Sequence, residues 1–308
     1  MVAVILVVEA GLGYPDALHQ RLPHPITWAG AAIAGLETRW NHPRHSGLAR
    51  RLLGLAMVVL VVGAAGLVGA AIQRLCGSSL AGQGVLVVIA TLGLAQNSLY
   101  RHVAAVLRPL KGPVDLPAAR QAVGRIVGRD VAGLDAPQIA AAALESLAES
   151  FNDGVVAPAF WLLVAGLPGL FAYKALNTAD SLVGHLEPRW RAFGWAAARG
   201  DDVANLIPAR LAGALIALAA GRGWRTMLRD APAHASPNAG WPEAAMAGAL
   251  GIRLGGPARY DGQWVDRPRF GDGAIPSASD LHRGLGLYLR ACALLVLMLG
   301  FGGWLWPR

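Results

Sequence analysis

The chain has few charged residues and almost no cysteine. Only 15% of its 308 residues are Asp, Glu, Lys or Arg, against about 25% in an average soluble domain. The two cysteines, Cys76 and Cys292, lie in or beside apolar runs and show no paired spacing. A disulfide framework or a zinc site is therefore not predicted, and both fit the role of small buried hydrophobic residues.

Several other features are missing. No Walker-type glycine loop occurs, and "GIRLGG" (Gly251–Gly256) is too weak a pattern to indicate a nucleotide site. There is no internal repeat, low-complexity tract or long flexible linker. The N-terminal "MVAVILVV" lacks a basic start and is followed by Glu9, so we do not expect a signal peptide.

What the chain has instead is apolar residues, 55% of the total, and 39 glycines, with a mean hydropathy of +0.44. Glycine is common in membrane helices that pack closely. The net charge of +8 does not form a basic stripe with interleaved aromatics, so nucleic acid is not an expected partner. The basic residues lie between apolar runs, as in a multi-pass inner-membrane protein, and membrane lipid is the expected surrounding.

Three apolar runs are long enough to cross a membrane: Leu53–Ile72, Leu80–Tyr100 and Arg290–Trp306. Arg44, Arg50 and Arg51 precede the first run, which predicts that it starts on the cytoplasmic side.

Two further runs are shorter or interrupted. Val155–Tyr173 contains Pro158 and the break "GLPG" (Gly166–Gly169), and Leu206–Ala220 has only fifteen residues. Such segments are more often re-entrant or buried in protein. The expected fold is all-α: one membrane-embedded helical bundle over residues 1–308 with re-entrant or broken helices. Cytoplasm-facing extramembrane helices and loops are expected over 221–289.

Four polar clusters could carry chemistry. In "LESLAESFNDGVVAPAFW", Glu145, Glu149 and Asp153 are spaced i, i+4 and i+8, which stacks three acids on one helix face and destabilises it. A divalent ion would relieve that repulsion, and Mg²⁺ is bound by one or two carboxylates together with phosphate oxygens. The alternative is a solvated face whose acids pair with arginines such as Arg125 and Arg129. The face ends in "NDG", a turn signal.

The second cluster is "AYKALNTADSLVGH". On a helix, Lys174, Asn177 and Ser181 share one side, and Asp180 lies next to them. The lysine alone could extend to the membrane interface. The polar residues that follow are poor helix formers and prefer specific hydrogen-bond partners, which favours a binding site.

The third cluster is "FGWAAARGDDVANLIPAR". Asp201 or Asp202 is a candidate helix N-cap. Two adjacent acids with Arg199 before them and Asn205 after them exceed what capping requires. Arg210 lies inside an apolar segment, where a charged residue indicates function.

The fourth cluster is "HASPNAGWPEAAMAGALGIRLGG". "SPNAG" predicts a turn whose backbone N–H groups could bind an anion. A helix with Pro242 in its first turn is expected to follow and to add its dipole. His234 fits either this site or an ordinary surface position.

These motifs resemble the adenosylcobinamide-phosphate synthase (CobD/CbiB) family of cobalamin biosynthesis. The matching stretches are the four above, from Glu145 to Gly256, in the order and spacing of the family. A weaker match runs from Glu9 to Pro25, where Glu9 and Tyr14 stand in place of the two acids of the family. Roles for these two residues therefore do not follow from the resemblance. After Glu149 the chain has Ser150 and Phe151 where the family has Asn and then Thr or Ser.

The resemblance implies a membrane ligase. ATP would drive amide formation between adenosylcobyric acid and aminopropanol phosphate, or a relative such as ethanolamine phosphate. ATP and Mg²⁺ are the expected cosubstrate and cofactor, and the cobalt belongs to the corrinoid substrate. A partner protein that supplies the amine and a homo-oligomer are both compatible with the sequence.

We assign hypothetical roles to the clusters on this basis. Lys174, Arg199 and Arg210 would contact phosphate oxygens, and Asp180 would take the ammonium proton. The remaining candidates fall into three groups: Mg²⁺ ligands (Glu145, Glu149, Asp153, with Asp201 and Asp202 as alternatives or a second site), substrate-binding residues (Asn177, Ser181, Asn205) and a phosphate-binding turn (Ser236, Asn238, Gly240).

The sequence leaves alternatives for the membrane topology and for the functional class. If all five runs crossed, 174–205 would face away from Glu145, so Val155–Tyr173 and Leu206–Ala220 are not both expected to be ordinary crossings. The rival function is a transporter or scaffold for a corrinoid precursor, because transporters also use broken helices and buried charge. The absence of a repeat and the three clear spans favour the enzyme.

Overall fold

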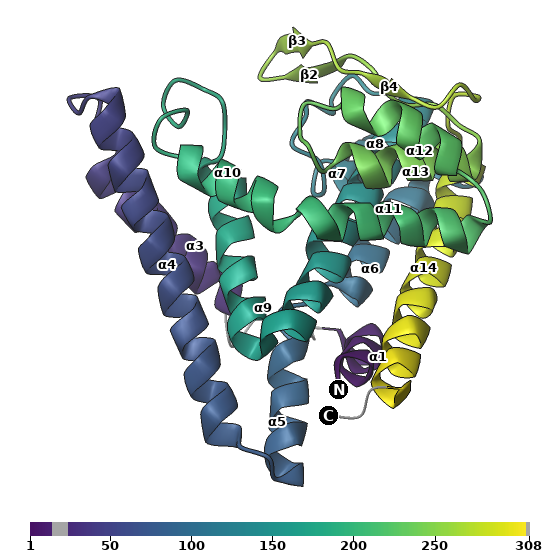
Figure 1. Cartoon of the computed structure of the whole chain (residues 1–308). Coiled ribbons are helices and arrows are strands. Elements are labelled where there is room, and N and C mark those ends of the chain that lie inside the picture. Colours follow the sequence, from purple (N-terminus) through teal and green to yellow (C-terminus); the bar gives the residue numbers. More distant parts are fainter. Residues whose placement is uncertain (14–23, 306–308) are drawn as a thin grey trace. The chain divides into compact units, whose positions relative to one another are not determined.

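The computed structural model describes residues 1–13 and 24–305, and most of these residues are helical. Figure 1 shows long helices together with a few short strands. Four helical runs within the described residues are long and apolar enough to cross a membrane: Gly47–Cys76, Leu80–Leu110, Ala136–Val183 and Ala278–Gly302. A fifth arises if Trp195–Ala204 and Leu206–Ala220 form one broken span. The described chain is thus compatible with a multi-pass membrane protein.

Contacts divide the chain into two compact units. Unit 1 comprises Met1–Ala95 and Ala157–Asn205, and unit 2 comprises Gln96–Val156 and Leu206–Arg308. The helices of unit 1 are α1 Val2–Leu12, α3 Pro25–Trp40, α4 Gly47–Cys76, α5 Leu80–Thr91, α9 Ala157–Val183 and α10 Trp195–Ala204. The prediction of a single membrane-embedded domain stays a prediction.

Unit 2 carries the other helices and all the described strands. Its elements are α6 Gln96–Leu107, η1 Arg108–Leu110, α7 Leu116–Val123, α8 Ala136–Phe151, the π-helical turn η2 Asn152–Val156, α11 Leu206–Ala220, α12 Trp224–Asp230, η3 Ala231–Ala233, α13 Gly240–Leu250, β1 Leu254–Gly255, β2 Ala258–Tyr260, β3 Gln263–Val265, β4 Arg269–Phe270 and α14 Ala278–Leu305.

Small residues let the helices of unit 1 pack closely. The core between α3, α4, α9 and α10 includes Met57, Ala175 and Ala179, all at most 3% exposed. A Cβ built on Gly54 of α4 would lie 1.8 Å from the carbonyl oxygen of Phe193. Glycine is therefore the residue that this helix contact admits, as expected where small residues set helix approach in membranes.

We expect Gly54→Ala to destabilise the protein although alanine favours helices. Replacing glycine with alanine inside a helix stabilises the fold by about 0.5–1 kcal/mol. The added methyl group would overpack the contact with Phe193, which destabilises the fold by about 1–3 kcal/mol. The melting temperature in detergent should therefore fall. Gly63→Ala on the same helix is the matched control, because nothing lies within 4 Å of its added Cβ. Equal melting temperatures for the two variants would contradict the close contact at Phe193.

The outer side of α4 is apolar. Only 17% of its most apolar window is buried, and Leu52, Val59 and Leu67 are 58–73% exposed. An exposed apolar surface of this length fits lipid contact.

Helix α9 is interrupted where the sequence predicts a break. Gly166 has φ 66° and ψ −155°, and Pro168 follows inside the same helix. The backbone N–H of Leu167 donates a 2.8 Å hydrogen bond to Oε1 of Gln73 on α4. The side chain of Gln73 thus satisfies a backbone donor that the break removes from the helix, as an apolar setting requires. The predicted break is confirmed. Whether this segment re-enters the membrane stays a prediction.

The other predicted runs match helices with different limits. Leu53–Ile72 and Leu80–Tyr100 lie within the first two candidate spans, and Leu206–Ala220 coincides with α11. The last helix begins at Ala278 rather than near Arg290, because Ser277 and Asp280 cap its start: Ser277 N donates to Asp280 Oδ2 at 2.9 Å. Residues 278–289 are therefore helical. Tyr14 and Trp306 lie outside the described residues.

Helix α8 begins where the sequence places a helix cap, but it does not end at the expected turn. Asp135 and Gln138 form a capping box at its beginning. The "NDG" segment does not end the helix as predicted. Asn152–Val156 continues it as a π-helical turn, a local widening that is common at functional sites. The prediction of a turn at this place was wrong.

The all-α prediction missed four short strands. β1 pairs with β4 and β2 pairs with β3, both antiparallel. The β2–β3 hairpin turns at Asp261 and Gly262, with φ of 47° and 79°. Asp-Gly is a strong hairpin signal, so the sequence "ARYDGQWV" was sufficient to predict the β2–β3 hairpin.

Candidate functional site

Two separate polar clusters hold most of the predicted site residues. In unit 1 the first cluster joins α9 to α10 around Asp201. Asn177 Nδ2 donates to Asp201 Oδ1 at 3.3 Å, and Asn205 Nδ2 donates to Asp201 Oδ2 at 2.9 Å. The Tyr173 hydroxyl lies 3.1 Å from Asn205 Oδ1. Asn205 is only 1% exposed, so these bonds are shielded from water.

Basic groups lie at the edges of this cluster. Lys174 Nζ donates to Asn177 Oδ1 at 3.4 Å. Arg199 pairs with Asp202 at 2.9 Å, and the Arg199 side chain is 66% exposed. Ser181 donates to the Asn177 carbonyl at 2.9 Å. The structure therefore brings Lys174, Asn177, Asp201 and Asn205 of the second and third motifs together.

The capping prediction for the acids was wrong. Asp201 and Asp202 lie in the second half of α10, whose N-cap residue is Gly194. The helix begins earlier because "WAAAR" contains good helix formers. Asp201 is then directed at side chains, with both carboxylate oxygens accepting amide N–H groups.

The second cluster lies in unit 2 and centres on Glu145 of α8. This carboxylate is 3% exposed. It forms an ion pair with Arg129, another with Arg267 at 3.1 Å, and accepts from the Gly255 N–H at 2.8 Å. The pairing with Arg129 fits one alternative that the sequence left open, but the carboxylate is buried rather than solvated.

Glu243 of α13 lies beside the same arginine. Its side chain is 3% exposed, and its Oε2 is 3.8 Å from Arg267 Nη2. Neither Glu243 Oε2 nor Arg267 Nη1 has a hydrogen-bond partner among the described residues. Burial, followed by the negative charges of Glu145 and Glu149, raises the pKa of Glu243 well above 4.5.

His234 completes the cluster. Its Nδ1 accepts the Ser236 backbone N–H at 2.9 Å, which in the neutral ring places the proton on Nε2. Burial lowers the pKa of His234, so the ring is neutral near pH 7. Nε2 lies 3.9 Å from Glu243 Oε1. His234 is thus a half-buried member of the cluster rather than a surface residue.

The predicted phosphate-binding turn is held by its own side chains. Ser236 Oγ accepts from the backbone N–H groups of Asn238 and Ala239, at 3.2 and 3.3 Å. Arg210 Nη1 donates to Asn238 Oδ1 at 3.2 Å, and its guanidinium lies 4.7 Å from the Trp241 ring centroid. Gly240 is buried at the start of α13. Arg210 and Asn238 therefore meet as one site, whereas a phosphate contact by the turn stays a prediction.

A protein-held magnesium site is not apparent in the described part of the chain. No group of three or more His, Cys, Asp or Glu side chains is placed to hold a metal ion there. Glu145 does not fit as a ligand, because two arginines and a backbone N–H already occupy its oxygens. Asp153 lies in the π-helical turn and accepts from Asn152 Nδ2 at 2.7 Å, while Glu149 is exposed on α8.

The raised pKa of Glu243 has a testable consequence for stability. A carboxyl whose pKa is higher in the folded state stabilises the fold fully below about pH 4.5, and this contribution is lost as the pH rises toward the folded value. Gln at this position stays neutral throughout. We expect the melting temperature of Glu243→Gln to exceed that of the parent by more at about pH 8 than at about pH 5, measured in detergent. A difference that does not change with pH would contradict a buried, protonated Glu243.

Sequence reasoning missed Arg267 and Glu243. Arg267 lies in a loop without a motif, and only folding places it against Glu145 and Glu243. Glu243 did have a signal: it is the only charged residue in the apolar segment "WPEAAMAGALGI", and isolated acids in apolar helices are seldom left without a buried partner.

Comparison with known proteins identifies the class to which this helical, membrane-compatible chain belongs. The model of the CobD/Cbib protein family matches residues 2–288. The chain belongs to this family.

Individual relatives cover nearly the whole length. A protein named "Cobalamin biosynthesis protein CobD" from Rhodobacter capsulatus is 49% identical over 99% of this chain and 98% of its own. Proteins of the same name from Sinorhizobium sp and Rhizobium meliloti are 45% and 42% identical, each over 96% of this chain and over 95% and 94% of their own. No solved structure matches the chain.

Proposed function

We propose that this protein is an ATP-dependent amide ligase of cobalamin biosynthesis. It joins adenosylcobyric acid to aminopropanol phosphate, or to ethanolamine phosphate, and forms adenosylcobinamide phosphate or its analogue. The observation that carries the proposal is the family match over residues 2–288, with relatives named for cobalamin biosynthesis. The Asp201-centred cluster supports it, because the predicted binding residues of two motifs meet there.

The reaction requires activation of a carboxylate. In our proposal a carboxylate oxygen of the corrinoid attacks the γ-phosphorus of ATP, which forms an acyl phosphate and releases ADP. The amine nitrogen then attacks the acyl carbon, and inorganic phosphate and one proton leave. Positioning and neutralisation of phosphate charge account for most catalysis in such transfers.

The clusters suggest how the chain contributes. Lys174, held beside Asn177, is the cation that we assign to a transferring phosphate. Asp180 on the same helix is the proposed acceptor of the ammonium proton, since only an uncharged amine is a nucleophile. Asp201 positions the amides of Asn177 and Asn205. Arg210 and Asn238 form a second polar site in unit 2, which we assign to the amino-alcohol phosphate.

Magnesium enters this proposal with the phosphates of ATP. The occupied oxygens of Glu145 favour a structural role for that residue. Glu149 and Asp153 remain the residues that we assign to contacts with the ion. Magnesium is usually bound through few carboxylates and several phosphate or water oxygens.

We place the enzyme in the cell inner membrane with its site facing the cytoplasm, where ATP is available. Four to five candidate spans support a multi-pass arrangement. The arginines before α4 support a cytoplasmic start of that helix. Thiol labelling of Ser181→Cys in intact cells tests the orientation, and labelling from outside would contradict it.

The function is tested with detergent-solubilised protein, adenosylcobyric acid, Mg·ATP and aminopropanol phosphate. Product is followed by mass, and ADP and phosphate are measured in parallel. Oxygen-18 in the corrinoid carboxylate should appear in the released phosphate if an acyl phosphate forms. Reactions without ATP, or with ethanolamine phosphate, are the controls.

The outcomes separate the alternatives. Amide product formed only with ATP supports the ligase. Bound corrinoid without product, over a range of amines, would contradict it and favour a carrier or scaffold.

A further inference from the structure

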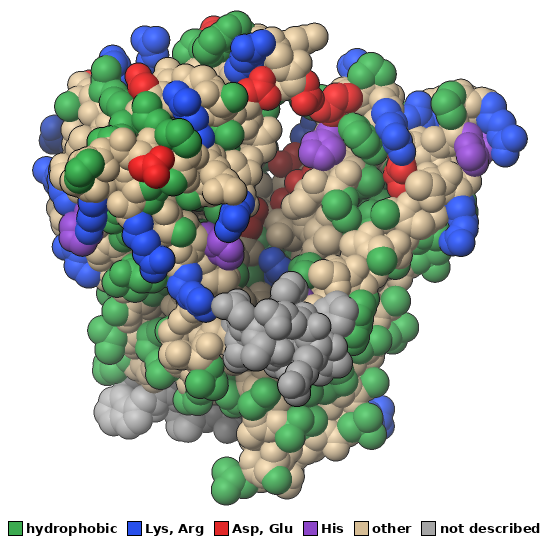
Figure 2. All heavy atoms as spheres, turned by 180° about the vertical axis from the view of Figure 1, so that it is seen from behind, with side chains coloured by type: hydrophobic (Ala, Val, Ile, Leu, Met, Phe, Trp, Pro, Cys, Tyr) green, Lys and Arg blue, Asp and Glu red, His purple; other side chains and the backbone are tan. Residues whose placement is uncertain are grey.

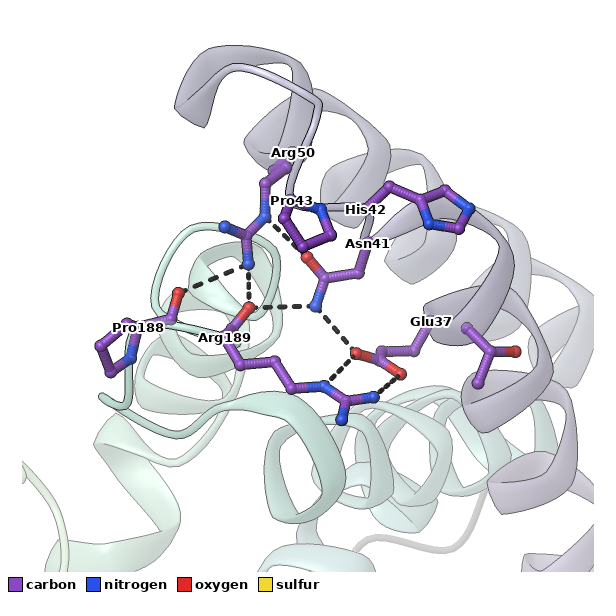
Figure 3. A pocket seen from close by; sticks show the side chains of 8 residues that line it. Glu37, Asn41, His42, Pro43, Arg50, Pro188 and Arg189 are labelled. Carbon is purple, nitrogen blue, oxygen red and sulfur yellow. Dashed lines mark hydrogen bonds and ion pairs between the residues drawn. The ribbon is translucent and has the colours of Figure 1, made fainter.

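Unit 1 contains a hollow that none of the motif clusters uses. It has a volume of about 600 Å³ and lies between the end of α3, the start of α4 and the segment around Pro188 and Arg189. Figure 3 shows Glu37, Asn41, Arg50 and Arg189 linked around it by hydrogen bonds. Sites for small molecules commonly have volumes of about 300–1,000 Å³.

The ion pair between Glu37 and Arg189 lines this pocket. Glu37 is 5% exposed, and Arg189 binds it through two bonds, Nε to Oε1 at 3.1 Å and Nη2 to Oε2 at 3.0 Å. Asn41 Nδ2 donates to the same carboxylate at 2.8 Å. Although burial opposes it, these hydrogen bonds lower the pKa of Glu37, so the pair is ionised and its charges cancel.

Arg50 is a second cation without an acidic partner. Its Nε donates to Asn41 Oδ1 at 2.7 Å, and its Nη2 donates to the carbonyls of Arg189 and Pro188. All of these acceptors are neutral, and Nη1 has no hydrogen-bond partner among the described residues. The pocket therefore keeps one positive charge after Glu37 and Arg189 cancel.

The surroundings increase this positive charge. Residues 37–51 and 185–191 contain six arginines and two glutamates, a formal charge of +4 with histidines neutral. Arg39, Arg44 and Arg51 are exposed, and Figure 2 shows Lys and Arg side chains gathered on the part of the surface where α3 ends and α4 begins. Leu48 and Leu52, 68% and 58% exposed, begin the apolar surface of α4 just beyond. The basic pocket thus lies where a membrane span starts.

We propose that this pocket binds a phosphate group, held by Arg50 together with Arg189 and His42. Arg50 Nη1, which donates to no described residue, offers a charged donor beside the positive charge that the pocket keeps, and charged N–H donors form strong hydrogen bonds with phosphate oxygens. The half-buried His42 ring lines the pocket and adds a further donor. The phosphate belongs either to an anionic lipid headgroup at the interface or to a soluble phosphomonoester. The site is independent of the ligase proposal, because it shares no residue with the clusters assigned there.

The test uses the full chain and two probes. Retention of phosphatidylglycerol is measured by native mass spectrometry after extraction from bilayers that contain it. Binding of glycerol 3-phosphate, a phosphomonoester without an amine, is measured by calorimetry in neutral detergent. Arg50→Gln should weaken the phosphate-dependent signal by about tenfold or more, as expected for loss of a charge and of a charge-assisted hydrogen bond. Arg44→Gln is the matched control, because it removes an exposed arginine nearby that does not line the pocket.

A second variant keeps the test decisive if Arg50→Gln does not fold. Thr38 is exposed and lines the pocket, so Thr38→Cys in a Cys76→Ser background reports occupancy while Arg50 is unchanged. Either probe should slow thiol labelling at position 38 but not at Ser46→Cys.

The two probes separate the sources. Protection by phosphatidylglycerol alone assigns a lipid headgroup, and protection by glycerol 3-phosphate assigns a soluble phosphate. Both results support the site. No protection by either probe, or equal weakening by Arg44→Gln and Arg50→Gln, would overturn it.

Discussion

Replacing Arg267 with methionine is expected to lower the melting temperature of the solubilised protein by about 10 °C, from a loss of about 3–5 kcal/mol. Methionine keeps most of the apolar stem and removes the guanidinium. Glu145 then loses one of the two arginines that pair with it. Glu243 loses the guanidinium of Arg267, which lies 3.8 Å from its carboxyl group. The Glu145 carboxylate stays buried with less compensation, and a buried charge without its partner is costly.

The matched control is Arg259→Met. Arg259 lies in β2, its side chain is 55% exposed, and it pairs with Asp130 at 3.6 Å. An exposed pair contributes about 0–1 kcal/mol, so its loss should shift the melting temperature only slightly. Melting is followed by intrinsic fluorescence in one detergent. Similar shifts for Arg259→Met and Arg267→Met would contradict the central role of the buried cluster.

Adding Glu243→Gln to Arg267→Met gives a further check. At about pH 8 the neutral Gln should restore more stability in the Arg267→Met background than in the parent, because the charge of Arg267 favours ionisation of Glu243. The coupling between the two changes is expected to be about 0.5–3 kcal/mol. Strict additivity would show that Arg267 acts on Glu145 alone.

The second large effect is expected on activity. We predict that Asp201→Asn lowers kcat/KM for corrinoid amidation by about 100-fold or more, because misplacing binding groups has effects of that size. An amide at position 201 presents an NH₂ group to one of the two amide donors of Asn177 and Asn205, so one of those hydrogen bonds is lost. The geometry around Lys174 changes with it.

The comparison for this prediction is Asp202→Asn. Asp202 pairs with Arg199, whose side chain is 66% exposed, so we expect less than about a tenfold loss from an exposed pair. A second variant, Asp201→Asn with Asn205→Asp, restores donor and acceptor complementarity. It should recover melting temperature, and its activity shows whether the charge must stand at 201. Activity of Asp201→Asn within about threefold of the parent would contradict the positioning role.

Local chemistry determined much of the helical framework. The apolar runs predicted three spans, and "GLPG" predicted the break at Gly166, because glycine and proline act on the backbone within a few residues. The two motifs were predicted to supply binding residues, but their meeting around Asp201 follows only from the folded structure. The straight-helix spacing of the three acids does not hold as far as Asp153, because the π-helical turn changes its position relative to Glu145. A role of the three acids as Mg²⁺ ligands stays a prediction.

The errors have a common origin. The N-cap assigned to Asp201 and the turn assigned to "NDG" were both inferred from local preference. In the folded chain Asp201 accepts from Asn177 of α9, Asp202 pairs with Arg199 of its own helix, and a π-helical turn continues through Asn152–Val156. Tertiary partners outweighed preferences of about 1 kcal/mol.

What the sequence by itself determined is the class of protein: an apolar, glycine-rich helical chain compatible with several membrane spans, with motifs of the CobD/Cbib family. Only the tertiary structure decided which charges are buried together. Arg267 lies 122 residues after Glu145, and Arg189 lies 152 residues after Glu37. Neither pairing has a local signal, because the energy that offsets burial of these charges comes from contacts that exist only once distant segments have met.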